Sequence, residues 1–290
     1  MIRHSMLVTG GLVATAVLLQ GCFDSSSGPS DNLTTDEEGI QNVLFEEQAD
    51  LADPDVRFYD DASSDAENVA IATNWWRREL LSLDKTVDIH VENPDEGPSI
   101  AEVVVNADAT GILHLFVCED STRTEYQKEF ADTAVRSMLF EKNRPIDRPH
   151  RGWQVQALSG VLIRSENTTR EIQSVRLQAG DVDVTIDDVE SLVPVEEITR
   201  LPRGQEVAIT VTTGDATDGV FLHLRHLGRR LELTNNGDGT YSGTFFTNGR
   251  RGPRHLVVDV LSNGTLYDDV APYDNVAWGI PYALIGDDES

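Results

Sequence analysis

Residues 235–241 read Asn-Asn-Gly-Asp-Gly-Thr-Tyr, and the chain on both sides of this stretch alternates between apolar and polar residues. The alternation covers residues 207–212 before it and residues 241–247 and 256–260 after it. A period of two is the pattern of a half-buried β-strand, and glycine-rich stretches between such segments form turns. Residues 205–286 are therefore predicted to be an all-β sandwich of short strands.

The same stretch is similar to the turns of filamin-type and other bacterial immunoglobulin-like repeats, because Asn-Gly-Asp-Gly-Thr-Tyr is followed by Gly252 before another β segment. The resemblance implies an immunoglobulin-like β-sandwich over residues 205–286. It also implies a structural turn at Gly239 and Tyr241, in which the tyrosine makes a corner hydrogen bond to the sheet. Such a fold carries many functions and by itself predicts none of them.

The chain before the sandwich is predicted to be a separate α+β domain. Residues 189–204 contain acidic residues, prolines and Gly204, and are predicted to be a linker. The domain itself is predicted to span residues 35–188, with two N-terminal helices on an antiparallel sheet.

Two helices are predicted at the start of this domain. Thr35 and Glu38 have the spacing of a capping box, which places the first helix at 36–48. The second is predicted to start near Ser64 or Asp65 and to run to about Leu81. Its predicted apolar face consists of Val69, Ala72, Trp76 and Leu80.

About seven strands are predicted after the helices, because the apolar period changes to two. Ala109-Thr110-Gly111 is interpreted as a tight turn between two of them. The predicted strands cover residues 87–91, 100–108, 112–118, 130–141, 153–164, 171–178 and 182–186.

Helices followed by long strands, with Gly152-Trp153-Gln154-Val155 opening a late strand, resemble the NTF2-like cone over residues 36–180. The sequence departs from that family because no third helix is evident among the strands. A half-open β-barrel, or a curved sheet capped by two helices, fits the same pattern.

The N-terminus resembles that of a bacterial lipoprotein. Leu19-Gln20-Gly21-Cys22 follows an apolar segment and matches the lipobox. The resemblance implies a signal peptide at 1–21, lipid such as palmitate on Cys22, and a flexible tether at 22–34. Phe23 after the cleavage site implies the outer membrane.

Two other kinds of N-terminal segment fit this sequence less well than a lipoprotein signal. A plain secretory signal usually ends in Ala-x-Ala, which is absent here. A transmembrane helix needs roughly 20 apolar residues, and this segment is shorter.

The charge of the chain excludes nucleic acid as a partner. There are 50 acidic and 23 basic residues, which gives a net charge of −27 and a pI near 4.4. Such a surface repels nucleic acid and anionic lipid headgroups. It resembles the acidic, lysine-poor surfaces of proteins from salty environments.

The sequence contains four candidate metal or thiol sites, most of which have simpler interpretations. His223 and His226 suggest zinc, but residues three apart on a strand face opposite ways, so surface or edge histidines are favoured. The 235–239 turn suggests calcium but lacks the acidic first position and the glutamate at position twelve. Loop aspartates of the second domain suggest a weak calcium site if they converge. Cys118 has no partner if Cys22 is acylated, and a buried inert thiol is favoured.

His114 is the one candidate for catalysis. It shares a strand face with Ile112 and Phe116 and would project into the concavity of a cone-shaped domain. General acid–base catalysis needs such a group within hydrogen-bond reach of a substrate. A core histidine with satisfied hydrogen bonds is favoured.

The sequence therefore predicts a non-enzymatic, lipid-anchored cell-envelope protein that acts as a binding or adhesion module. Its expected contacts are the membrane, through the lipid, and an unidentified protein or glycan. No cofactor or nucleic acid is predicted. The alternatives are a tethered enzyme with its site near His114 and a purely structural spacer.

Overall fold

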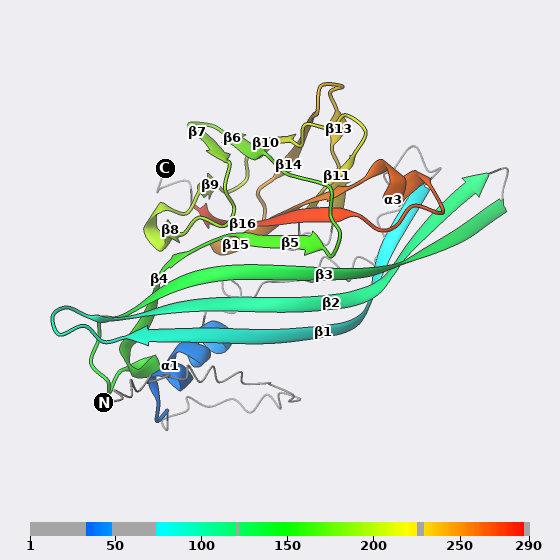
Figure 1. The fold of residues 1–290 in the computed structure, drawn as a ribbon. Coiled ribbons are helices and arrows are strands. Elements are labelled where there is room, and N and C mark those ends of the chain that lie inside the picture. Colours follow the sequence, from blue (N-terminus) through cyan, green and yellow to red (C-terminus); the bar gives the residue numbers. More distant parts are fainter. Residues whose placement is uncertain (1–32, 48–73, 120–121, 225–228, 287–290) are drawn as a thin grey trace, which may run out of the picture.

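The computed structural model describes residues 33–47, 74–119, 122–224 and 229–286. These residues are mostly β-strand and form two sheets, one packed against part of the other (Figure 1). Helical structure within the described residues consists of short pieces: α1 (Asp36–Asn42), η1 (Val43–Glu47), η3 (Pro149–Gly152), η4 (Val195–Glu197) and α3 (Asn263–Tyr267).

The larger sheet contains eleven strands of the described chain. Its main path has the order β1-β2-β3-β5-β16-β15-β11-β12, with β4 and β9 pairing to the side of it and β8 pairing with β4. The strands are β1 (Asn74–Glu92), β2 (Ser99–Glu119), β3 (Thr122–Lys142), β4 (Trp153–Leu158), β5 (Val161–Ser165), β8 (Val193–Pro194), β9 (Arg200–Pro202), β11 (Gly219–Leu224), β12 (Arg229–Glu232), β15 (Gly252–Leu261) and β16 (Asn275–Ile285).

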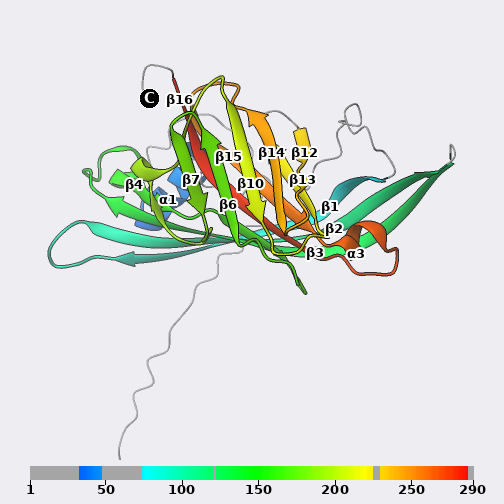
Figure 2. The ribbon, with the colours of Figure 1, turned by 90° about the horizontal axis from the view of Figure 1, so that it is seen from above.

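The smaller sheet has five strands in the described chain, in the order β13-β14-β10-β6-β7. It lies across β15 and β16, as Figure 2 shows. The strands are β6 (Ser174–Ala179), β7 (Val182–Ile186), β10 (Glu206–Thr212), β13 (Thr234–Asn235) and β14 (Thr240–Phe246).

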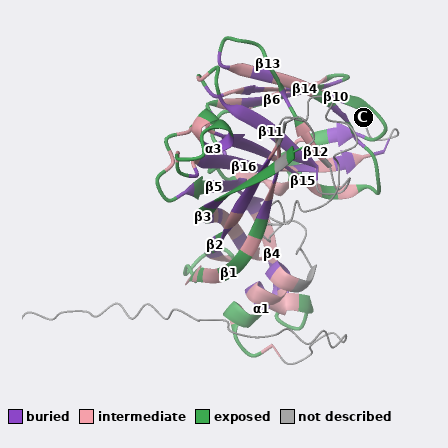
Figure 3. Cartoon of the chain, turned by 90° about the vertical axis from the view of Figure 1, so that its right-hand side faces the viewer, coloured by how far each residue is buried: buried purple, intermediate pink, exposed green. Residues whose placement is uncertain are grey.

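The two sheets form a β-sandwich whose core explains the alternating sequence. Val207, Ile209 and Val211 on β10 are buried against apolar residues of β11, β15 and β16. Figure 3 shows buried residues along both sheets of this region. Burial of one face of each sheet is the arrangement that a period of two produces.

β1, β2 and β3 are antiparallel strands of 19 to 21 residues that continue beyond the sandwich. Their inner face carries Ala101, Val103 and Val105, on which the apolar side of α1 and η1 packs. The capping box predicted at Thr35 and Glu38 is present at the start of α1. The first predicted helix is therefore confirmed, with a π-helical second half.

The larger sheet curls until its first and last path strands touch. Arg230 on β12 donates to the backbone oxygen of Trp76 on β1 at 3.0 Å, and its guanidinium lies 3.6 Å from the centre of the Trp76 ring. A second apolar cluster fills the inside of this curve, where Leu113 and Phe130 are buried with Leu266 of α3.

The predicted α+β class with two N-terminal helices is wrong, and the NTF2-like expectation falls with it. Residues 74–81, predicted as the end of the second helix, begin β1 and pair with β2; residues 64–73 lie outside the described residues. Trp76 and Leu80 share a helix face, but residues four apart also share a strand face, so the pattern fits both structures.

The turn predicted at Ala109-Thr110-Gly111 is also wrong, because β2 continues through it, paired with β3 without interruption and with β1 across a one-residue shift of register. Most other predicted strands are confirmed, including those at 182–186, 207–212, 241–247 and 256–260.

The division into domains at 189–204 stays a prediction. Hydrogen bonds do cross it: β6 pairs with β10, and β16 pairs with β5. The sandwich is thus built from both sides of the predicted linker.

Candidate ligand-binding site

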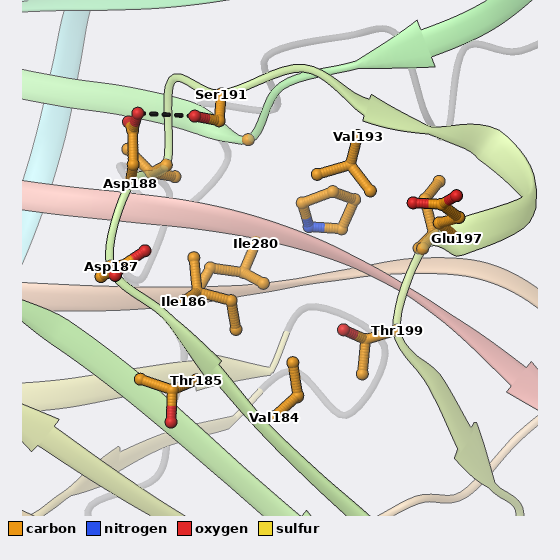
Figure 4. Close-up of a pocket in the computed structure, with 14 residues that line it drawn as sticks. Val184, Thr185, Ile186, Asp187, Asp188, Ser191, Val193, Glu197, Thr199 and Ile280 are labelled. Atoms are coloured by element: carbon orange, nitrogen blue, oxygen red, sulfur yellow. Dashed lines mark hydrogen bonds between the residues drawn. The ribbon is translucent and has the colours of Figure 1, made fainter.

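A cavity of about 270 Å³ lies between β7, the segment 187–199 and β16 (Figure 4). Most of its lining comes from one stretch of chain that leaves β7 and passes through β8 and η4 toward β9. The lining residues are Gly160, Val184, Thr185, Ile186, Asp187, Asp188, Val189, Ser191, Val193, Glu197, Ile198, Thr199, Ile280 and Pro281.

The floor of the cavity is apolar. Val184 and Ile186 point from β7 toward the sandwich core and are half-buried there, while the alternate residues of β7 are exposed. Ile280 of β16 and Ile198 are buried. Since β7 is the edge strand of the smaller sheet, no further strand of that sheet covers this side among the described residues.

The rim of the cavity is acidic. Asp188 accepts hydrogen bonds from the Ser191 hydroxyl at 2.6 Å and the Glu190 backbone N–H at 2.9 Å. The Ser191 bond, followed by the Glu190 bond, lowers the pKa of Asp188. Asp188 thus holds the loop that forms the cavity wall.

Asp187 and Glu197 are the other two acids of the rim. Both are exposed, and neither carboxylate has a hydrogen-bond partner in the part of the chain that the structure describes. Figure 4 shows them on opposite sides of the floor, with Ile186 between them. Two carboxylates beside an apolar floor can accept hydrogen bonds from a ligand that also buries apolar surface.

A second cavity, of about 340 Å³, is lined by Arg170 and by loop residues including Asp215 and Asp274. The loop aspartates that suggested calcium do converge here, with Asp218 beside them. Arg170 Nη1 lies 2.7 Å from Asp215 Oδ2 and 2.9 Å from Asp218 Oδ1. The Arg170 guanidinium already bonds to these carboxylates and balances one of their negative charges, so the chemistry of the cluster favours an internal ion pair over a cation site.

His114 lies on the outer face of β2 and lines neither cavity. It is buried, with Nδ1 2.6 Å from Glu125 Oε1 and Nε2 2.9 Å from Glu79 Oε2. Its ring stacks on Phe116 at an interplanar angle of 8°. The predicted satisfied histidine is confirmed, but it does not face a concavity of the first domain, because residues 113 and 115 occupy the inner face of β2.

The interpretation of His223 as a surface or edge histidine is wrong. His223 is buried in β11, where all six residues are buried, and its Nε2 lies 2.9 Å from Asp259 Oδ2. His226 lies outside the described residues. Among the described residues, no group of three or more His, Cys, Asp or Glu side chains is arranged to hold a metal ion.

The turn around Gly239 has the backbone that glycine permits. Gly237 and Gly239 have φ of 85° and 82°, which is the left-handed region. Tyr241 donates a hydrogen bond from its hydroxyl to the Asp215 backbone oxygen at 2.8 Å. Asp238 accepts bonds from the Thr240 N–H and hydroxyl, so its carboxylate is used within the turn.

The lipobox and Cys22 lie outside the described residues, as does most of the predicted tether. The backbone of Cys118 belongs to β2, while its side chain lies outside what the structure describes. Within the described chain, no helix combines the length and the apolar character needed to cross a membrane.

The sequence did not point to the cavity. The alternation at 182–186 predicts only a strand with one apolar side, and the sequence of 189–204 predicts only a linker. The cavity forms where residues 189–199 pass over β16, a strand that follows them by some 90 residues in the sequence. A local pattern carries no signal for such a contact.

Comparison with known proteins adds no family. No family model matches the chain, and no curated protein matches it. The cavity and the sequence of the N-terminus are therefore the features that bear on function.

Proposed function

We propose that this chain is a lipid-anchored cell-envelope protein that acts by binding, with a small ligand held in the cavity between β7 and β16. The observation that carries the proposal is the cavity itself, about 270 Å³ with an apolar floor and an acidic rim. Apolar clefts with a few polar groups at their edge are the usual form of small-ligand sites.

The anchor of the proposed protein is the lipid on Cys22. The lipobox at Leu19–Cys22 and the polar segment that follows support an acylated N-terminus with a flexible connection to α1. Phe23 supports the outer membrane as its location. The partner of the membrane-bound protein is a small molecule in the cavity or a protein or glycan at the sandwich loops.

The anchoring part of the proposal is tested by labelling cells with an alkyne analogue of palmitate. The wild-type chain should incorporate the label and fractionate with the outer membrane. Cys22→Ser should do neither, while Cys118→Ser should behave as wild type. Equal labelling of Cys22→Ser would reject the anchor.

An immunoglobulin-like form of the sandwich is part of the same proposal. It is supported by the two packed sheets and by the Tyr241 hydroxyl, which bonds to the loop at Asp215. Domains of this kind present loops at their ends for partner binding.

The binding part is tested with 2-phenylethanol, a neutral probe small enough for the cavity. In amide NMR spectra of the chain, shifts should be confined to residues 184–199 and to those around Ile280. Val193→Trp places an indole in the cavity and should abolish the shifts, whereas Val270→Trp, at an exposed site, should not. Shifts spread over the surface, or none, would reject the cavity as a site.

A tethered enzyme with His114 as a proton-transfer group is the weaker alternative. Glu79 and Glu125 occupy both ring nitrogens of His114, and His114 lines neither cavity. His114→Ala should abolish substrate turnover if this candidate is right. Unchanged turnover or ligand behaviour in that variant would reject it.

A further inference from the structure

We propose that the ligand of this cavity is an organic ammonium ion, with its apolar body on the floor and its charged group at the acidic rim. The inference depends on the proposed function and adds the chemical class of the ligand. It follows from which polar groups line the cavity and which of them already have partners.

The charged residues of the described chain that line the cavity are all acidic: Asp187, Asp188 and Glu197. None of the described Lys, Arg or His residues belongs to the lining. Asp188 is engaged by Ser191 and Glu190, whereas Asp187 and Glu197 have no hydrogen-bond partner among the described residues. The site thus offers two acceptors with negative charge and no cationic donor.

An anionic ligand is disfavoured by this lining and by the net charge of −27. A bare metal ion is disfavoured for a different reason. The floor of Val184, Ile186 and Ile280 provides no ligand atoms for a metal.

An organic ammonium ion uses both parts of the cavity. Its apolar body removes the floor from water, while its N–H groups donate to the rim carboxylates in charge-assisted hydrogen bonds. Figure 4 shows Asp187 and Glu197 flanking the floor, so a ligand lying over Ile186 reaches a carboxylate from either end.

Three probes of one shape separate charge from apolar fit: 2-phenylethylammonium, 2-phenylethanol and phenylacetate. Affinities are measured from amide NMR titrations of the full mature chain, followed at the residues that line the cavity. We expect the ammonium ion to bind about tenfold or more tightly than the alcohol at low ionic strength, and phenylacetate to bind most weakly.

The rim is tested with the double variant Asp187→Asn, Glu197→Gln. Both side chains are exposed, so the fold should be kept. The preference for ammonium over alcohol should fall to about two- to threefold or less, with little change in the affinity for the alcohol. The matched control, Asp181→Asn with Glu206→Gln, removes two exposed acids that do not line the cavity and should keep the preference.

The outcomes separate the inference from the proposed function. If the alcohol and the ammonium ion bind the wild-type cavity equally, the ammonium inference is overturned and the cavity remains a binding site. If the control variant loses the preference as fully as the rim variant, general surface charge explains it and the inference is overturned. If no probe shifts the cavity residues, both proposals fail.

Discussion

Arg78 on β1 donates two hydrogen bonds to the carboxylate of Asp259 on β15, with Nη1–Oδ2 at 2.7 Å and Nη2–Oδ1 at 3.1 Å. Both side chains are fully buried. In the sheet, β2, β3, β5 and β16 lie between the two strands. The ion pair therefore joins the long strands to the sandwich across the inside of the curved sheet. Asp259 also accepts hydrogen bonds from His223 and Asn275.

Asp259→Asn is expected to destabilise the protein by about 3–5 kcal/mol, because it leaves the Arg78 charge buried without its counter-charge. Guanidinium or urea denaturation measures the change in the free energy of unfolding. The double variant Arg78→Met, Asp259→Leu should recover most of the loss, since apolar replacements remove both charges together.

Arg176 and Asp183 provide the matched control for this prediction. They form a bidentate pair at the surface, where their side chains are 49% and 50% exposed. Asp183→Asn should cost about 0–1 kcal/mol. A cost for Asp259→Asn no larger than that of the surface variant would contradict the assigned role of the buried pair.

The same pair predicts how stability depends on pH. Burial by itself raises the pKa of Asp259, but Arg78 and then His223 outweigh it and hold the pKa well below the ordinary value of 3.8. The folded protein thus binds fewer protons than the unfolded chain. The stability that Asp259 contributes is present above about pH 4 and is lost as the pH falls toward its folded pKa.

Denaturation at a series of pH values between about 5 and 2 should show the free energy of unfolding falling with pH. In the double variant Arg78→Met, Asp259→Leu the slope should be smaller. Other acids with lowered pKa values, such as Asp215, are kept in both proteins. Equal slopes would show that Asp259 is not a source of the acid sensitivity.

Sequence patterns predicted the parts of the fold that depend on neighbouring residues. The alternation of Val207, Ile209 and Val211 with polar residues predicts β10, because a half-buried strand has a period of two. The spacing of Thr35 and Glu38 predicts α1, because the capping box is a local set of hydrogen bonds. In both cases the physical cause lies within a few residues.

The contacts between residues far apart in the sequence, which form the interior, could not be predicted from such local patterns. Arg78 and Asp259 are 181 residues apart, and residue 78 falls within the second predicted helix. His223 is predicted from the sequence to be a surface or edge histidine, because His223 and His226 are three apart on a strand and face opposite ways. β11 is instead buried on both faces. The hydrogen bond to Asp259 satisfies the His223 ring inside the protein.

Gly111 shows why a glycine within an alternating pattern need not be a turn. It sits in β2 opposite the irregularity at Leu80 and Ser82 of β1. A Cβ at this position would collide with the Glu79 backbone oxygen and the Phe130 ring. The strand therefore needs glycine for a close approach.

Gly111→Ala is expected to lower the free energy of unfolding by about 1–3 kcal/mol, as overpacking does. Chemical denaturation measures the loss, and Glu102→Ala on the exposed side of β2 serves as the control. That control should stay within about 0.5 kcal/mol of wild type. A Gly111→Ala variant as stable as wild type would show that the strand relaxes around the added methyl group.

Asp84 on β1 and Asp108 on β2 face each other as exposed register partners on the outer side of the long strands. Like charges directly opposite on neighbouring strands are destabilising. Asp108→Thr should therefore raise the free energy of unfolding by about 0.2–1 kcal/mol. The gain should shrink as salt is added, because the Debye length falls to about 3 Å at 1 M.

Glu129→Thr separates the local pair from the overall charge of the chain. Glu129 is an exposed acid on β3 whose partner on β2 is Ile112, so its removal changes the net charge equally without relieving a facing acid. Denaturation of both variants at low and at high salt should show a larger, more salt-sensitive gain for Asp108→Thr. Equal gains in the two variants would mean that the effect comes from the net charge of −27. Repulsion would then be spread over the whole acidic surface and not concentrated between Asp84 and Asp108.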